Sequence, residues 1–127
     1  VENLGEGDDV TISCESHLAL ALQSRGLYKA AEQRARHCLK VAVRNHGRDA
    51  AITWSCMNNV ATLLQQLGRL EEADTMYRAV LRSRRRSLGR KHPDTLLSMH
   101  NLAAALTSMG LIEAAEPFCR EATVGFL

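Results

Sequence analysis

The chain has 127 residues, a formal net charge of +2 and a hydrophobic content of 46%, which suits one packed domain. Aromatic residues make up only 4%, and a core of alanine, leucine, valine and methionine favours packed helices over a sheet. No stretch reaches the roughly 18 to 20 apolar residues of a membrane span. The charge is too mild to indicate nucleic acid by itself. Because the chain begins with Val1, we expect it to be a fragment of a longer protein.

A 42-residue repeat runs through the chain. Gly26, Gly68 and Gly110 are 42 residues apart, and each has an alanine seven residues before it and another five residues after it. Segments 53–80 and 95–122 share nine identities in 28 ungapped positions. Self-similarity at this period is typical of solenoids, in which neighbouring repeats bury each other's apolar faces.

Each copy of the repeat predicts two helices, because its apolar residues recur at helical spacing. A glycine in the left-handed conformation is expected to end the first helix of each copy. The repeats are expected at about 8–49, 50–91 and 92–127. We expect no strand and a frayed segment at residues 1–7. The predicted helices, in chain order, are 9–25, 28–45, 50–67, 70–88, 93–109 and 112–125.

The ends of the first helix in each copy also have expected signals. Asp8 and Asp49 are candidate N-caps for the first two copies, and Pro93 suits the first turn of the helix in the third copy. A second glycine series with the same 42-residue spacing is expected to mark the turns between repeats: Gly5, Gly47 and Gly89.

The four cysteines form no Cys-x-x-Cys pair and have no histidine cluster beside them. Cys14 and Cys56 are 42 residues apart, so we expect both to be small packing residues buried at the same seam. No metal site or cofactor is expected. The histidines form no metal-ligand pair, and the chain has neither a nucleophile elbow nor a phosphate loop, so we do not expect an enzyme.

The joint Ser-Leu-Gly-Arg-Lys-His-Pro-Asp-Thr at residues 87–95 and the Gly-x-(Tyr/Leu/Ile)-x-x-Ala turn of each copy resemble tetratricopeptide repeats, in the 42-residue variant of kinesin light chains. The same turn argues against a HEAT or armadillo array, the alternative with a similar period. The resemblance implies an all-α, right-handed superhelix of three antiparallel helix-turn-helix repeats. It also implies that the first helix of each repeat lines a concave groove.

Groove positions in such a domain are polar and rich in amides here, so they could pair with the backbone of an extended peptide. The resemblance to kinesin light chains suggests an acidic ligand. A merely solvated polar face is the alternative. The lysines and arginines of a chaperone-tail clamp are missing. The candidate groove residues are Ser16, Asn58, Asn59, Thr62, Gln65, Gln66, His100, Asn101 and Thr107.

A basic patch lies on the predicted helix 70–88, where four arginines share one face: Arg78, Arg82, Arg85 and Arg86. The patch could dock an acidic partner, or it could be a solvated face that Glu71, Glu72 and Asp74 partly neutralise. Nucleic acid is disfavoured, because few aromatic residues are available to stack on bases.

A second function is end-to-end self-association, because a repeat array without a polar cap exposes its terminal apolar surface. The candidate residues at the C-terminal end are Phe118, Val124, Phe126 and Leu127. Under either function we expect a protein partner and a cytoplasmic location, with a cytoskeletal or ciliary assembly suggested by the resemblance.

Overall fold

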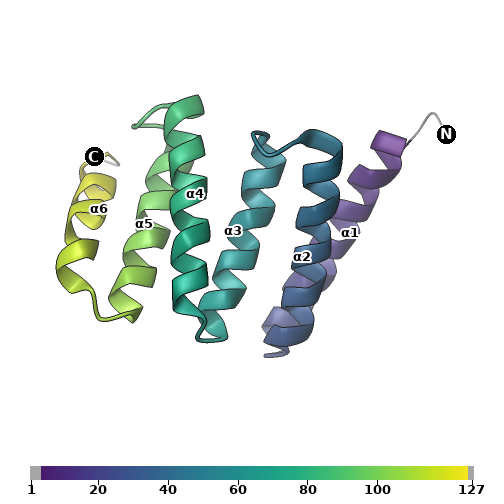
Figure 1. Cartoon of the computed structure of the whole chain (residues 1–127), viewed down its shortest axis with the longest axis horizontal. Coiled ribbons are helices and arrows are strands. Elements are labelled where there is room, and N and C mark those ends of the chain that lie inside the picture. Colours follow the sequence, from purple (N-terminus) through teal and green to yellow (C-terminus); the bar gives the residue numbers. More distant parts are fainter. Residues whose placement is uncertain (1–3, 126–127) are drawn as a thin grey trace. The chain divides into compact units, whose positions relative to one another are not determined.

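The structure, a computed structural model, describes residues 4–125, with side chains described from Asp9 to Gly125. These residues form six α-helices and no strand (Figure 1). The all-α prediction is therefore confirmed. No helix in this range is long and apolar enough to cross a membrane. The helices are α1 (Leu4–Ser24), α2 (Tyr28–His46), α3 (Ala51–Gln66), α4 (Leu70–Leu88), α5 (Pro93–Ser108) and α6 (Ile112–Gly125).

The chain divides into two compact units, the first ending at Gly68 and the second beginning at Arg69. The first unit contains α1, α2 and α3, and α2 packs against both of the others. The second unit contains α4, α5 and α6, and α5 packs against both of the others. The expected repeat boundaries stay a prediction.

Left-handed glycines end the helices as predicted. At the first turn Gly26 has a φ of 80°, a conformation that residues with a Cβ atom rarely adopt. The N–H of Leu27 then donates to the carbonyl of Leu22 at 2.9 Å, which closes the turn in the manner of a Schellman motif. Positive φ recurs at each of the predicted turn glycines between α2 and α6: Gly47, Gly68, Gly89 and Gly110.

The predictions for the start of the chain were wrong. Helix α1 begins at Leu4, so Gly5 lies inside a helix and Asp8 is not its N-cap. The expected fraying of residues 1–7 is contradicted for 4–7, which are helical, while 1–3 lie outside the described residues. Packing of α1 against α2 supports the helix despite the roughly 1 kcal/mol that an interior glycine costs.

The expected cap at Asp49 was also wrong. The N-cap of α3 is Ala50, which makes no side-chain capping bond. Instead the hydroxyl of Thr53, in the first turn of α3, donates to the carbonyl of Gly47 at 2.6 Å. The turn between α2 and α3 is therefore stabilised by a side chain of α3 and not by a capping residue that precedes the helix. At α5 the Nδ1 atom of His92 accepts a bond from the N–H of Asp94 at 3.1 Å, and Pro93 occupies the first helical position as expected.

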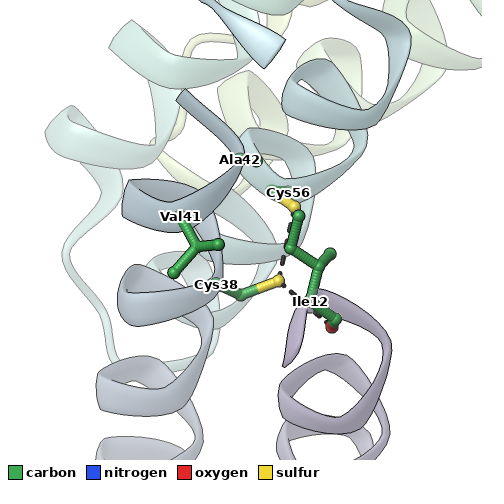
Figure 2. Close-up of a cluster of buried hydrophobic side chains, with 5 residues drawn as sticks. All are labelled: Ile12, Cys38, Val41, Ala42 and Cys56. Carbon is green, nitrogen blue, oxygen red and sulfur yellow. Dashed lines mark hydrogen bonds between the residues drawn. The ribbon is translucent and has the colours of Figure 1, made fainter. Parts of the chain in front are cut away.

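The joint where α2 meets α3 in the first unit is apolar and contains two thiols. Figure 2 shows Ile12 of α1, then Cys38, Val41 and Ala42 of α2, and Cys56 of α3 gathered in one buried cluster. The Sγ atom of Cys38 lies 3.4 Å from that of Cys56 and donates to the carbonyl of Ile12 at 3.5 Å. The joint thus ties all three helices of the unit together.

The two cysteines at the same repeat position differ in burial. Cys56 is buried as predicted, but Cys14 is exposed, so that prediction was wrong. The reason is the neighbour of each helix. Cys56 packs against α2, the helix that precedes α3 in the chain, whereas no helix precedes α1 in the described residues.

The corresponding joint in the second unit is polar. Arg84 of α4 is only 7% exposed, and its Nη1 atom donates to the Oγ of Ser98 at 2.7 Å and to the carbonyl of Asp94 at 3.3 Å. Burial lowers the pKa of the Arg84 guanidinium, and the nearby charge of Asp94 opposes that effect. The buried charge is held by acceptors at the start of α5.

Candidate functional site

Polar residues lie on two helices of the first unit and are called the polar rows below: Ser16 and Gln23 on α1, and Asn58, Asn59, Thr62, Gln65 and Gln66 on α3. An amide pair joins the two helices. The Nε2 atom of Gln23 on α1 donates to the Oε1 of Gln66 on α3 at 2.8 Å. Gln23 was missed by the groove prediction, although it lies 42 residues before Gln65. The repeat register alone could have identified it.

The six candidate groove residues of the first unit differ in how available they are. Asn59 and Gln66 are exposed, and the other four are half-buried. The hydroxyl of Thr62 donates to the carbonyl of Asn58 at 3.0 Å within the same helix. The Oγ of Ser16 lies 3.2 Å from the Sγ of Cys38. The exposed amides are therefore the residues of this set best placed to meet a ligand.

The three candidates of the second unit lie on α5. His100 and Thr107 are exposed and Asn101 is half-buried. The hydroxyl of Thr107 donates to the carbonyl of Ala103, four residues earlier, at 2.8 Å. His100 and Thr107 also line a hollow of about 470 Å³ between α5 and α6. Their assignment to a peptide groove stays a prediction, as does that of the first-unit residues.

A small ionic cluster ties α1 to α2 beside the polar row. The carboxylate of Glu15 accepts a bond from Nη1 of Arg34 at 3.0 Å and lies 3.0 Å from Nδ1 of His37. Burial raises the pKa of Glu15, but hydrogen bonds from His37 and Arg34 outweigh it, so the pKa lies below its usual value. Glu15 is thus held as a carboxylate.

The buried thiols of Cys38 and Cys56 influence each other. The hydrogen bond from the Cys56 thiol lowers the pKa of Cys38 while it raises the pKa of Cys56. The residues that the structure describes contain no group of three or more histidine, cysteine, aspartate or glutamate side chains arranged to hold a metal ion. The arrangement is that of a packed joint.

The four arginines of the predicted basic patch separate into two groups on α4. Arg78, Arg82 and Arg85 line one hollow of about 220 Å³, whereas Arg86 is exposed and lies outside it. Arg78 also pairs with Asp74, with 3.0 Å between Nε and Oδ1. Whether any of these arginines binds a partner stays a prediction.

Of the four residues predicted for self-association, the structure describes Phe118 and Val124. Phe118 is half-buried, with the guanidinium of Arg78 5.8 Å from its ring centroid. Val124 is 62% exposed near the end of α6. Phe126 and Leu127 lie outside the described residues. The sequence signal for this group was the hydrophobicity of its members in a terminal repeat without a polar cap, which does not say which face of a helix each residue occupies.

Comparison with known proteins gives the family. The sequence model of the family Tetratricopeptide repeat matches residues 10–78 and 49–123. No curated protein matches the chain. A putative kinesin light chain with nearly identical TPR-like repeats from Podosopora anserina has a similar structure, with a TM-score of 0.83 and 19% identity over 96% of this chain and 56% of that one. The structure of BtubC (BKLC) from P. vanneervenii gives a TM-score of 0.60 and 18% identity over 93% and 64%.

At these identities the likeness shows a common fold. The chain spans between 56% and 64% of the length of those two structures. The family match overturns the HEAT or armadillo alternative. Repeats of this family generally mediate protein–protein interactions. Because two overlapping family matches together span residues 10–123 and the helices keep the predicted register, this chain belongs to the tetratricopeptide repeat family, with repeats of the kinesin light chain fold.

Proposed function

We propose that the chain is a protein-interaction module that binds an extended peptide segment of a partner along the polar rows of α1 and α3. The observation that carries the proposal is the amide pair of Gln23 and Gln66, which bridges the two helices; a further amide, Asn59, is exposed on α3. Amide side chains donate and accept hydrogen bonds, so they suit a peptide backbone whatever its side chains.

Proteins with this fold are typically non-enzymatic scaffolds, which supports a binding role. The candidate residues on α1 and α3 are uncharged. A preference for an acidic peptide would therefore have to come from charged residues around the rows. We place the interaction in the cytoplasm, following the fold likeness to kinesin light chains.

Binding of a labelled peptide library, with acidic and neutral members, tests this proposal. Asn59→Ala and Gln66→Ala should each weaken selected peptides by roughly 3- to 10-fold, the range expected for one lost hydrogen bond. Gln33→Ala is the matched control, because Gln33 is an exposed amide on α2 of the same unit. Unchanged affinity in both test variants would remove the groove as the site.

A second candidate function, end-to-end association of copies, is favoured by a difference in burial between equivalent residues. Val60 of α3 is fully buried, and its counterpart 42 residues earlier, Leu18 of α1, is 46% exposed. Ile52 packs against the thiol joint, and its counterpart Val10 is 58% exposed. Helix α1 thus exposes apolar residues whose counterparts on α3 are buried or partly buried.

The second unit has a surface suited to that exposed face. The hollow of about 470 Å³ on α5 and α6 is lined largely by small and apolar side chains, including Ala103, Ala104, Ile112 and Ala115. In the first unit, the equivalent surface of α1 and α2 meets α3, and only about 10 Å³ remains open there. We propose that α1 of a second copy occupies the hollow, as α3 occupies its counterpart.

Such contact between two different surfaces predicts open, head-to-tail association. Sedimentation velocity should show a mass that rises with concentration, and Leu18→Glu or Ala104→Glu should each give a monomer. A mixture of these two variants should form dimers, because each keeps the surface that the other has lost. Ala114→Glu, on an exposed part of α6 outside the hollow, is the control. A strict monomer at every concentration would rule the function out.

A further inference from the structure

Two thiols face each other in the joint between α2 and α3. The Sγ atom of Cys38 lies 3.4 Å from the Sγ of Cys56, and a dashed line joins the two sulfur atoms in Figure 2. Neither peptide binding nor the association of copies, as proposed above, uses these thiols. The equivalent positions 42 residues later are Val80 and Ser98, so the second unit has no counterpart of this pair.

A small hollow connects the thiols with the surface. Its volume is about 10 Å³, and its lining includes both cysteines, the half-buried Ser16 and the exposed Asn59. This is room for about one water-sized molecule. Cys38 and Cys56 are only 2% and 3% exposed, so a bulky reagent does not reach them. The hollow is wide enough for one oxygen atom of hydrogen peroxide, the part of that oxidant that must meet a sulfur.

The surroundings give the two thiols different acidities. The hydrogen bond from Cys56 lowers the pKa of the Cys38 thiol, although burial opposes this effect. The hydrogen bond with the Ser16 hydroxyl lowers the pKa of Cys38 further. The bond to Cys38 and burial both raise the pKa of Cys56. Because the thiolate is the nucleophile, Cys38 is suited to attack an oxidant while Cys56 stays protonated beside it.

We propose that Cys38 and Cys56 form a redox-sensitive pair, which hydrogen peroxide converts into a disulfide bond between α2 and α3. The Cys38 thiolate attacks one oxygen of the peroxide, the O–O bond breaks, and hydroxide leaves and takes up the proton that Cys38 has lost. Cys38 is then a sulfenic acid. The Cys56 sulfur forms an S–S bond with Cys38, the S–O bond breaks, and the oxygen leaves with the Cys56 proton as water. The two thiols lose two electrons and two protons, and the peroxide is reduced to two water molecules.

The disulfide would restrain the first unit reversibly. The two sulfur atoms have to approach from 3.4 Å to about 2.0 Å, a shift that the existing packing of α2 on α3 can accommodate. The bond closes a loop between residues 38 and 56 and restricts the unfolded chain, so it should raise the melting temperature by roughly 5 to 15 °C. A dithiol reductant would break the bond by exchange and restore both thiols.

Peptide mapping of the reduced chain after mild treatment with hydrogen peroxide tests the proposal. Mass spectrometry should show the loss of two hydrogen atoms, and trypsin should release residues 37–40 joined to residues 49–69. The bond should form before the exposed Cys14 or Cys119 is oxidised, and dithiothreitol should separate the two peptides. A disulfide that involves Cys14 or Cys119, a Cys38 that is oxidised without joining Cys56, or a bond that forms only in urea would overturn the proposal.

Variants of the cysteines complete the experiment. Cys38→Ala and Cys56→Ala should each abolish the linked peptides, and Cys56→Ala should leave Cys38 as a sulfenic acid that dimedone traps. The matched control combines Cys14→Ala with Cys119→Ala, which removes two exposed thiols and should form the bond within about twofold of the parent rate. Melting under reducing conditions shows which variants are folded, and the peptide map of the parent decides the question without them. An oxidised parent that melts no higher than the reduced chain would overturn a bond that fits the existing packing.

Discussion

The two joints between consecutive helices, α2 with α3 and α4 with α5, use the same repeat positions for different chemistry. In the first unit, Ala42 and Cys56 occupy positions that Arg84 and Ser98 occupy in the second, 42 residues later. Ala42 is fully buried, and Arg84 is 7% exposed. The first joint packs thiols and methyl groups, and the second buries a guanidinium on neutral oxygens.

The repeat register therefore sets which positions form the joint between two helices, but it does not set which side chains occupy those positions. A large charged residue is tolerated at this position because Ser98 and the Asp94 carbonyl supply acceptors at hydrogen-bond distance. An alanine is tolerated in the other joint because the thiol of Cys56 fills the space beside it. Each solution depends on its partner across the joint, so exchanging one side alone should be destabilising.

The largest effect is expected from placing an arginine at position 42, which corresponds in the first joint to Arg84 in the second. Ala42→Arg would bury a guanidinium beside Cys38 and Cys56, where no oxygen equivalent to that of Ser98 accepts from it. The free energy of unfolding in urea should fall by about 3–5 kcal/mol, the usual cost of an uncompensated buried charge. Ala30→Arg, on the exposed side of α2, should cost little. A loss below about 1 kcal/mol for Ala42→Arg would contradict the difference between the joints.

The next largest effect is expected from removing Arg84 from the joint between α4 and α5. Arg84→Ala leaves the Ser98 hydroxyl without its donor and a void along the buried stem, which together should cost about 2–3 kcal/mol of unfolding free energy. Arg84→Met, which keeps most of the stem, should recover part of that loss. Arg86→Ala, an exposed change on the same helix, should stay within about 0.5 kcal/mol of the parent. If all three variants melt alike, the buried guanidinium is not a structural contact.

A smaller effect should follow from exchanging single atoms at the two joints. Ser98→Cys replaces the oxygen that accepts from Arg84 with a weaker acceptor, and Cys56→Ser places a hydroxyl in the apolar joint. Each should cost about 1 kcal/mol, measured by chemical denaturation. Cys14→Ser makes the same change as Cys56→Ser at the exposed repeat position and should be nearly neutral. Equal effects of the two cysteine changes would mean that burial does not distinguish these positions.

The smallest effect concerns Glu15, which ties α1 to α2 at a position that is Met57 and Met99 in the later repeats. Its pKa is lowered in the folded chain from an ordinary value of 4.5. Its stabilisation is therefore present above about pH 4.5 and is lost as the pH falls through the lower folded value. Glu15→Gln should cost less than about 1 kcal/mol at pH 7, and the difference from the parent should shrink in acid. An equal cost at pH 7 and pH 3 would mean that the charge of Glu15 contributes nothing.

Much of the fold could be predicted because its signals are local or strictly periodic. A glycine such as Gly26 ends a helix through its own backbone freedom, and alanines at fixed spacing mark the faces where helices approach closely. The prediction was wrong where a local signal competed with packing. Gly5 repeats the spacing of the turn glycines, yet α1 continues through it because that helix packs on α2.

The candidate sites were predicted less completely. The polar residues of α1 and α3 could be chosen from the register, but the pairing of Gln23 with Gln66 depends on how closely two helices approach. The sequence placed Arg85 on the basic face of the predicted helix 70–88 and left Arg84 off it, without indicating what either residue contacts. Only the structure separates Arg84, buried at a joint, from Arg85, which lines a hollow with Phe118.

By itself, the sequence determined the six helices of the described residues, the turns between them and the repeat family, because each copy repeats the same backbone preferences and the same pattern of apolar residues. Only the tertiary structure decided which equivalent residues are buried. Cys14 and Cys56, or Leu18 and Val60, have the same place in the register and opposite environments. The physical reason is that a residue is buried only where another helix packs against it. The repeat register specifies the residue at a position but not the helix beside it.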